Sequence, residues 1–75
     1  MVLVKFFASL RDQVGIAEIK VSAEAGLTAR DIWERAVNII LPDNVLVAVN
    51  QEYASLDSSI MDQDEVAFFP PVTGG

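Results

Sequence analysis

The apolar residues at the start of the chain recur with the two-residue period of a β-strand. Residues Val2–Ser9 are rich in valine and phenylalanine, and they predict a first strand. Residues Ala17–Ser22 alternate apolar with charged side chains, which indicates a second strand with one buried face. Between the two, Leu10–Val14 followed by Gly15 predicts a single turn or a short helix that lets the chain double back.

The middle of the chain changes to the period of an amphipathic helix. Thr28 fits an N-cap, because Asp31 follows three residues later and can complete a capping box. The apolar positions that follow form one helical stripe, consisting of Ala29, Ile32, Trp33, Ala36, Val37 and Ile40. Pro42 cannot donate a backbone hydrogen bond and restricts the residue before it, so we expect the helix to end near Ile39 or Ile40.

The second half of the chain predicts further strands. Val45–Val49 reads as a strand, Asn50–Glu52 as a turn and Tyr53–Ser55 as a short edge strand. The acidic stretch Asp62–Asp64 turns the chain into a last strand, Glu65–Phe69. The predicted fold class is therefore α+β, with a mixed four- to five-strand sheet packed on one main helix.

A single helix covers only one face of such a sheet, which makes the outward apolar residues informative. If Val66 and Phe68 face the helix, Phe69 points outward, and Phe7 does the same on the first strand. With Tyr53 nearby at the edge, these residues predict an exposed aromatic patch that binds partners. The alternative, that loops cover Phe7 and Phe69, stays open at this point.

The end of the sequence offers a chemical group of its own. Residues 1–70 form the predicted domain, and residues 71–75 form a predicted extended tail that ends in Val72, Thr73, Gly74 and Gly75. Pro70 and Pro71 favour extended geometry, and two glycines without Cβ atoms can enter a narrow pocket on a partner enzyme. The α-carboxylate of Gly75 is therefore the best candidate for the working group.

Composition removes most other kinds of site. The 75 residues are 52% hydrophobic and include neither cysteine nor histidine, which excludes disulfides, thiolate nucleophiles, persulfides and histidine-based acid–base or metal sites. We expect no metal and no cofactor bound by this chain. Because the sequence has neither a membrane-span-length apolar run nor a signal-like start, we expect no membrane association and a cytoplasmic protein.

Charge is distributed unevenly along the chain. All five basic residues lie in residues 1–35 beside five acids, whereas residues 36–75 contain six acids and no base, so the net charge of -6 belongs to the half with the tail. This distribution argues against nucleic acid as a ligand and favours a partner with a basic docking surface. A solvated acidic face that only maintains solubility is the alternative.

These features together resemble a known family, the small subunits of molybdopterin synthase. The resemblance rests on Phe6–Ala8 with Arg11, on Val49–Gln51, and most specifically on the terminal run from Asp64 to Gly75. It implies a ubiquitin-like β-grasp fold and adds Arg11 to Phe7, Tyr53 and Phe69 as a partner-binding residue. The family commonly has glycine where Gln63 stands, so we expect Gln63 to occupy a less comfortable φ or the turn to differ.

The resemblance also implies a role as a sulfur carrier in molybdenum cofactor biosynthesis. An E1-like enzyme would use ATP and magnesium to adenylate Gly75, and a sulfur donor protein would convert it to a thiocarboxylate. The large subunit, in a heterotetramer with this chain, would then use the sulfur to form the dithiolene from cyclic pyranopterin monophosphate. Catalytic residues are expected in the large subunit, so this chain is a sulfur-donating subunit and not an enzyme by itself.

Three other interpretations remain open from the sequence. A sulfur carrier for thiamine or tRNA thiolation would share the fold, the tail and the activation. A ubiquitin-type modifier would join Gly75 to lysines of target proteins. A plain interaction domain would have the same fold with an unreactive tail.

Overall fold

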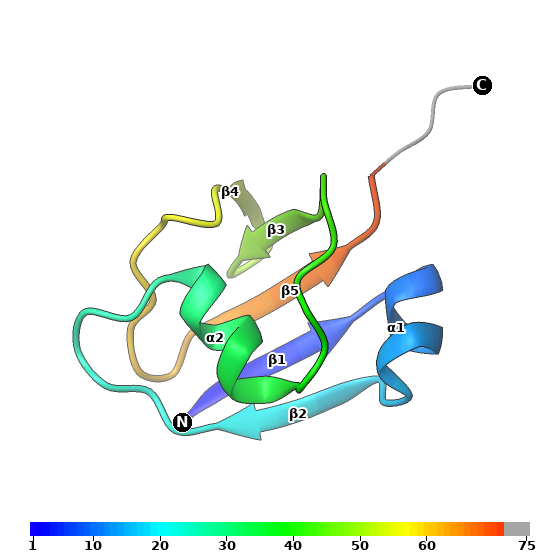
Figure 1. Cartoon of the computed structure of the whole chain (residues 1–75). Helices are drawn as coiled ribbons and strands as arrows, with labels where there is room; N and C mark the ends of the chain where they lie inside the picture. The colour runs from blue at the N-terminus through cyan, green and yellow to red at the C-terminus, as the bar shows by residue number, and fades with distance from the viewer. Residues whose placement is uncertain (72–75) are drawn as a thin grey trace.

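The computed structural model describes residues 1–71, and in this range the chain forms five strands and two helices (Figure 1). Their order is β1 (Val2–Phe6), α1 (Ala8–Val14), β2 (Glu18–Val21), α2 (Ala29–Ala36), β3 (Leu46–Val49), β4 (Glu52–Ala54) and β5 (Glu65–Phe69). The sheet has the order β2-β1-β5-β3-β4. Strands β1 and β5 are parallel and the other pairs antiparallel, so the predicted mixed sheet is confirmed.

Helix α2 crosses one face of the sheet and covers the core (Figure 1). The centre of the core is an aromatic cluster in which Trp33 of α2 lies 5.6 Å from Phe6 and 5.2 Å from Phe68 between ring centroids. Phe6 and Phe68 are directly paired in β1 and β5, and their rings stack. As the alternation predicted, Val66 and Phe68 are fully buried on the helix side.

The start of α2 has the capping box that the sequence predicted. The Thr28 hydroxyl accepts a hydrogen bond from the Asp31 N–H (3.3 Å), and the Asp31 carboxylate accepts one from the Thr28 N–H (2.9 Å). The next two helical N–H groups, of Ala29 and Arg30, donate to backbone carbonyls of the segment before β5. The capping box therefore satisfies the helix start, as predicted.

The predicted end of α2 at Ile39 or Ile40 is wrong, because the helix ends at Ala36. Val37 leaves the helix in an extended conformation, with a φ of -141°, and packs against the core. The buried indole N–H of Trp33 then finds its acceptor in the Ile39 carbonyl oxygen. The apolar stripe of the helix therefore ends before Val37, and Ile40, which was predicted to belong to it, is 91% exposed.

The first strand is also shorter than predicted. Strand β1 ends at Phe6, whereas Ala8 and Ser9 begin α1. The last regular ladder bonds on both sides lie here, since the Phe6 N–H donates to Ala17 on one side and the Phe7 N–H donates to Phe68 on the other. The predicted reversal is confirmed, and α1 closes at Gly15, whose φ of 87° is left-handed and whose N–H bonds the Arg11 carbonyl oxygen.

The remaining predicted elements are found with small shifts at their ends. Strands β2 and β3 are slightly shorter than Ala17–Ser22 and Val45–Val49, and β4 begins one residue early, at Glu52. Strand β5 has the predicted bounds. Within residues 1–71 there is no helix of sufficient length and hydropathy to cross a membrane.

Candidate functional site

The sheet face opposite α2 carries the side chains that sequence analysis placed outward. The strand registers put Tyr53 opposite Ala48, Ala48 opposite Ala67, and Ala67 opposite Lys5. Because directly opposed residues share one face of a sheet, these four side chains form a row across four strands. The outer face is thus assembled from β4, β3, β5 and β1.

The two alanines give this row a shallow centre. Ala48 and Ala67 are small, and larger side chains surround them, which leaves a hollow of about 370 Å³. The hollow is lined by Lys5, Phe7, Ala48, Gln51, Tyr53, Glu65, Ala67 and Phe69. A hollow with an apolar floor and an aromatic rim fits an apolar side chain from a protein partner.

The predicted aromatic patch lies at the rim of this hollow, on the side of the tail. The Phe69 ring lies 5.9 Å from the Phe7 ring and 5.9 Å from the Tyr53 ring, both in edge-to-face geometry. Phe7 is 44% exposed and Tyr53 is 77% exposed, while Phe69 between them is half-buried. The structure therefore brings the three predicted aromatics together on the surface, and loops do not cover Phe7.

The backbone fixes Phe7 in this position from two sides. Its N–H donates to the Phe68 carbonyl oxygen at 3.1 Å, which extends the β1–β5 ladder by one bond. Its carbonyl oxygen accepts from the N–H groups of Leu10 and Arg11, at 3.1 and 3.4 Å, which starts α1. The following residue, Ala8, has a φ of 52°, so the chain turns sharply after Phe7. Phe7 is thus held at the junction of a strand and a helix.

Arg11 lies near Phe7 in the chain but does not line the hollow. It is an exposed residue of α1, and the contact with Phe7 given above runs through the backbone. Figure 1 shows α1 at the end of the sheet where β5 finishes. The structure places Arg11 beside the aromatic patch without making it part of the hollow's lining.

The tail residues predicted to carry the chemistry lie outside the described residues. These are Val72, Thr73, Gly74 and Gly75. The described chain leads toward them from Phe69 through a half-buried Pro70 and an exposed Pro71. The last described residues before the tail are therefore part of, or adjacent to, the aromatic patch.

Few charged groups occur in the hollow. Lys5 and Glu65 pair across the sheet face at 3.3 Å, and both side chains are about one-third exposed. The carboxyl groups with lowered pKa lie elsewhere: the backbone N–H and hydroxyl of Thr28 lower the pKa of Asp31, and the N-terminal ammonium group lowers that of Asp62. Residues 1–71 contain no cluster of three or more potential metal ligands. The described part of the outer sheet face therefore offers an apolar hollow with a single ion pair in its lining.

Sequence reasoning missed the hollow itself and its ion pair. The alternation of β5 showed that Ala67 faces outward, but the contribution of Ala48 and Lys5 depends on strand order and register. The order of elements along the chain, which the sequence predicted, does not determine the strand order or the register of the sheet. It also missed the exposure of Ile40, since the helical stripe assigned that residue to the core side.

Comparison with known proteins gives consistent results. Residues 4–75 match the ThiS family. The chain is 40% identical to the molybdopterin synthase sulfur carrier subunit of Escherichia coli K12 and 39% identical to that of Haemophilus influenzae, with 100% of both chains covered in each case. The crystal structure of SAMP1 from Haloferax volcanii superposes with a TM-score of 0.80 at 29% identity, covering 99% of this chain and 98% of that chain.

These matches establish the family. The family match extends over nearly the whole chain, and the curated relatives align from end to end. The chain therefore belongs to the ThiS family and has its ubiquitin-like β-grasp fold, as the sequence resemblance implied.

Proposed function

We propose that this ThiS-family chain is the sulfur carrier subunit of a molybdopterin synthase. The observation that carries the proposal is the end-to-end similarity to two curated sulfur carrier subunits, in a family match that includes Gly75. The absence of cysteine from the sequence leaves the C-terminus as the evident place for sulfur.

The chemistry assigns one role to this chain and the rest to its partners. A carboxylate oxygen of Gly75 attacks the α-phosphorus of ATP in an E1-like enzyme, which holds the magnesium, and pyrophosphate leaves. Sulfide-level sulfur from a sulfur donor protein then attacks the acyl carbon, and the new C–S bond replaces the C–O bond to AMP, which leaves; the product is the thiocarboxylate. The large subunit uses this sulfur to build the dithiolene of molybdopterin. Because the dithiolene contains two sulfur atoms, two thiocarboxylate chains must each deliver one sulfur.

The outer sheet face would serve as the docking surface for both the activating enzyme and the large subunit. Phe7, Tyr53 and Phe69 supply aromatic contact area at the point where the chain continues into the tail. Because the tail must enter each partner, the two complexes are mutually exclusive. Arg11 stands beside this surface as an additional polar contact.

Intact-mass measurement tests the proposal directly. The purified chain is incubated with ATP, magnesium, the activating enzyme and a sulfur source, and its mass should rise by the difference between sulfur and oxygen. The isolated thiocarboxylate form should then support dithiolene formation with the large subunit and precursor, without ATP or a sulfur source. Equal product from the plain carboxylate form would show that the sulfur comes from another donor.

A second function has specific structural support. The H. volcanii small archaeal modifier protein 1 superposes on this chain with a TM-score of 0.77 at 27% identity, covering 95% of this chain and 97% of that chain. A modifier would form an isopeptide bond between Gly75 and target lysines, so tagged chain recovered from cells would carry covalently attached proteins. A carrier for thiamine or tRNA thiolation is distinguished by sulfur transfer to those acceptors instead of the pterin.

A further inference from the structure

The segment Val37–Asn44, which connects α2 to β3, presents isoleucine to solvent on a fixed backbone. Ile40 is 91% exposed, the highest value among the large apolar side chains of residues 1–71, and Ile39 is 41% exposed. The segment is nevertheless anchored, because Val37 and Leu41 pack against the core and the Ile39 carbonyl oxygen accepts the Trp33 indole N–H at 2.7 Å. Ile40 thus projects from a backbone that is fixed by the partly buried Val37 and Leu41 and by the Trp33 hydrogen bond.

The segment also borders a second hollow. A space of about 590 Å³ lies between it and the solvent side of α2. Its apolar lining includes Ile39, Ile40 and Leu56, and its charged lining consists of Arg30, Glu34 and Asp43. A projecting apolar side chain beside a hollow with a charged rim is a shape that a protein surface can complement.

The place of the segment in the fold indicates what covers it. The segment leads into Leu46, the first residue of β3, and Leu46 pairs with Phe69, the last residue of β5. Figure 1 shows the segment rising to the same end of the sheet at which the chain leaves β5 toward the tail. The hollow beside the segment lies on the α2 side of the molecule, whereas the aromatic patch, which includes Phe69, lies on the opposite face of the sheet. A protein that takes in the tail therefore meets both at this end of the sheet, one on each face.

A second copy of this chain fits the segment less well than such a partner. One exposed isoleucine with its neighbours offers far less than the roughly 800 Å² per partner of a stable interface. As an addition to the aromatic patch and the tail, the same side chain contributes to a larger contact. The charge distribution also favours a partner with basic groups, because residues 36–75 contain six acids and no base, and Asp43 of the segment is exposed.

We infer that the 37–44 segment is a second anchor for the large subunit, with Ile40 entering an apolar pocket that has basic groups at its rim. This inference rests on the proposed function. Contacts at the segment on the α2 side and at the aromatic patch on the opposite face fix the rotation of the carrier in the partner as well as its distance. They orient the terminal carboxyl carbon in the partner, a contribution that a single patch cannot make.

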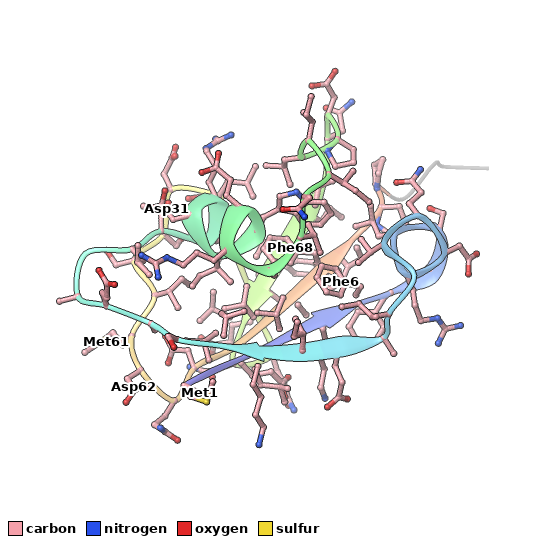
Figure 2. The ribbon with its side chains drawn as sticks, turned by 60° about the horizontal axis from the view of Figure 1, so that its bottom comes forward. Met1, Phe6, Asp31, Met61, Asp62 and Phe68 are labelled. Atoms are coloured by element: carbon pink, nitrogen blue, oxygen red, sulfur yellow. The ribbon has the colours of Figure 1, made fainter. Side chains whose placement is uncertain are left out.

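Titration calorimetry with the large subunit encoded by the same genome tests the inference. Ile40→Ser removes the anchor, and Met61→Ser is the matched control, because Met61 is 71% exposed and lies at the far end of the molecule beside the ion pair of Met1 and Asp62 (Figure 2). We expect Ile40→Ser to raise Kd about tenfold or more, the effect of exposing one buried isoleucine, and Met61→Ser to change it by less than about twofold.

The charged rim is tested separately with Asp43→Lys. If basic groups face Asp43, this variant should slow association at low ionic strength, and the difference from wild type should shrink in high salt. Unfolding followed by the fluorescence of Trp33, the single tryptophan, should show the wild-type midpoint for Ile40→Ser, because the replaced side chain is exposed. Should Ile40→Ser lower that midpoint, Ile40→Lys gives the same test with an exposed, charged side chain.

The outcomes separate this inference from the proposed function. Tight wild-type binding that Ile40→Ser leaves unchanged overturns the anchor and leaves the carrier function intact. No binding of the wild-type chain to the large subunit removes both. A wild-type dimer in sedimentation that Ile40→Ser dissociates shows that the segment binds a second copy, which also overturns the inference.

Discussion

The indole N–H of Trp33 and the backbone carbonyl oxygen of Ile39 form a 2.7 Å hydrogen bond that links the core to the surface. The ring of Trp33 packs edge-on against both Phe6 and Phe68 inside the fold, whereas the side chain of Ile39 is exposed. One residue therefore completes the core and also fixes the path of the 37–44 segment.

Replacing Trp33 with Phe should uncouple these two roles. The smaller ring leaves a cavity and cannot donate to Ile39, so we expect the free energy of unfolding to fall by about 2 kcal/mol. Amide hydrogen exchange in the 37–44 segment should accelerate more than in β1 and β5. Equal acceleration in all three would show that the hydrogen bond has no local effect on the segment.

The capping carboxylate of α2 predicts a dependence of stability on pH. Hydrogen bonds from the backbone and hydroxyl of Thr28 hold the folded-state pKa of Asp31 below its ordinary value of 3.8. Its stabilising contribution is therefore present above that value and is lost as the pH falls through the lowered pKa, because the unfolded state takes up the proton first.

Asp31→Asn should consequently flatten the loss of stability between about pH 5 and pH 3. Asp57→Asn is the control, since Asp57 is a largely exposed carboxylate whose 3.6 Å contact with Arg30 is exposed to solvent. Urea unfolding at several pH values measures both. Identical acid profiles for wild type and Asp31→Asn would contradict the capping argument.

The parts of the fold that follow from local pattern could be predicted from the sequence. Strand β5, the Thr28 cap and the outward direction of Phe69 depend on residues close together in the chain, so periodicity was sufficient. The end of α2 depends on a contact between Trp33 and Ile39, which forms only once the tryptophan is buried. Neither the helical stripe nor Pro42 contains that information.

The candidate site shows the same division. Phe7, Tyr53 and Phe69 were each predicted to be exposed, and the structure adds their mutual contacts. The hollow above Ala48 and Ala67 required the register of β3 with β5, which joins positions far apart in sequence. The roles of Gly75 and of the preceding tail residues remain predictions, because those residues lie outside the described range.

The turn before β5 contains a residue under backbone strain. Gln63 has a φ of 75°, as expected for a position at which the resembling family commonly has glycine. Left-handed geometry costs a residue with a Cβ roughly 1–2 kcal/mol, while glycine loses more entropy on folding, about 0.4–1 kcal/mol. Gln63→Gly should therefore be more stable than Gln63→Ala by about 0.5 kcal/mol.

Thermal unfolding of the two variants decides this point, since both lack the glutamine side chain and differ only in the Cβ. The Gln63 N–H bond to the Met1 carbonyl oxygen, 3.0 Å long, is available to either replacement. A higher melting temperature for Gln63→Ala would show that the turn is not strained.

The terminal glycine can be tested without disturbing the core. Deletion of Gly75, or extension of the chain beyond it, should abolish dithiolene synthesis, because the reacting carboxyl group is then lost or misplaced. All buried residues of the described core precede Pro70, so unfolding should be unchanged. Wild-type synthesis by the Gly75-deleted chain would reject the carrier role of the C-terminus.

Phe69 is the residue at which the aromatic patch and the route to the tail meet. Its ring contacts Phe7 and Tyr53, and Phe69→Asp would place a charge between them. Truncation of a central aromatic at an interface costs on the order of 2 kcal/mol or more, so Kd should rise about 30-fold for both the activating enzyme and the large subunit.

Met61→Asp, which adds the same charge at a distant exposed position, should leave both affinities near the wild-type values. Phe69 is half-buried and lies outside the core cluster, so the variant should still unfold cooperatively. If binding to both partners is unchanged, the outer sheet face is not the docking surface, and if cooperative unfolding is lost, Phe69 is a structural residue rather than a contact.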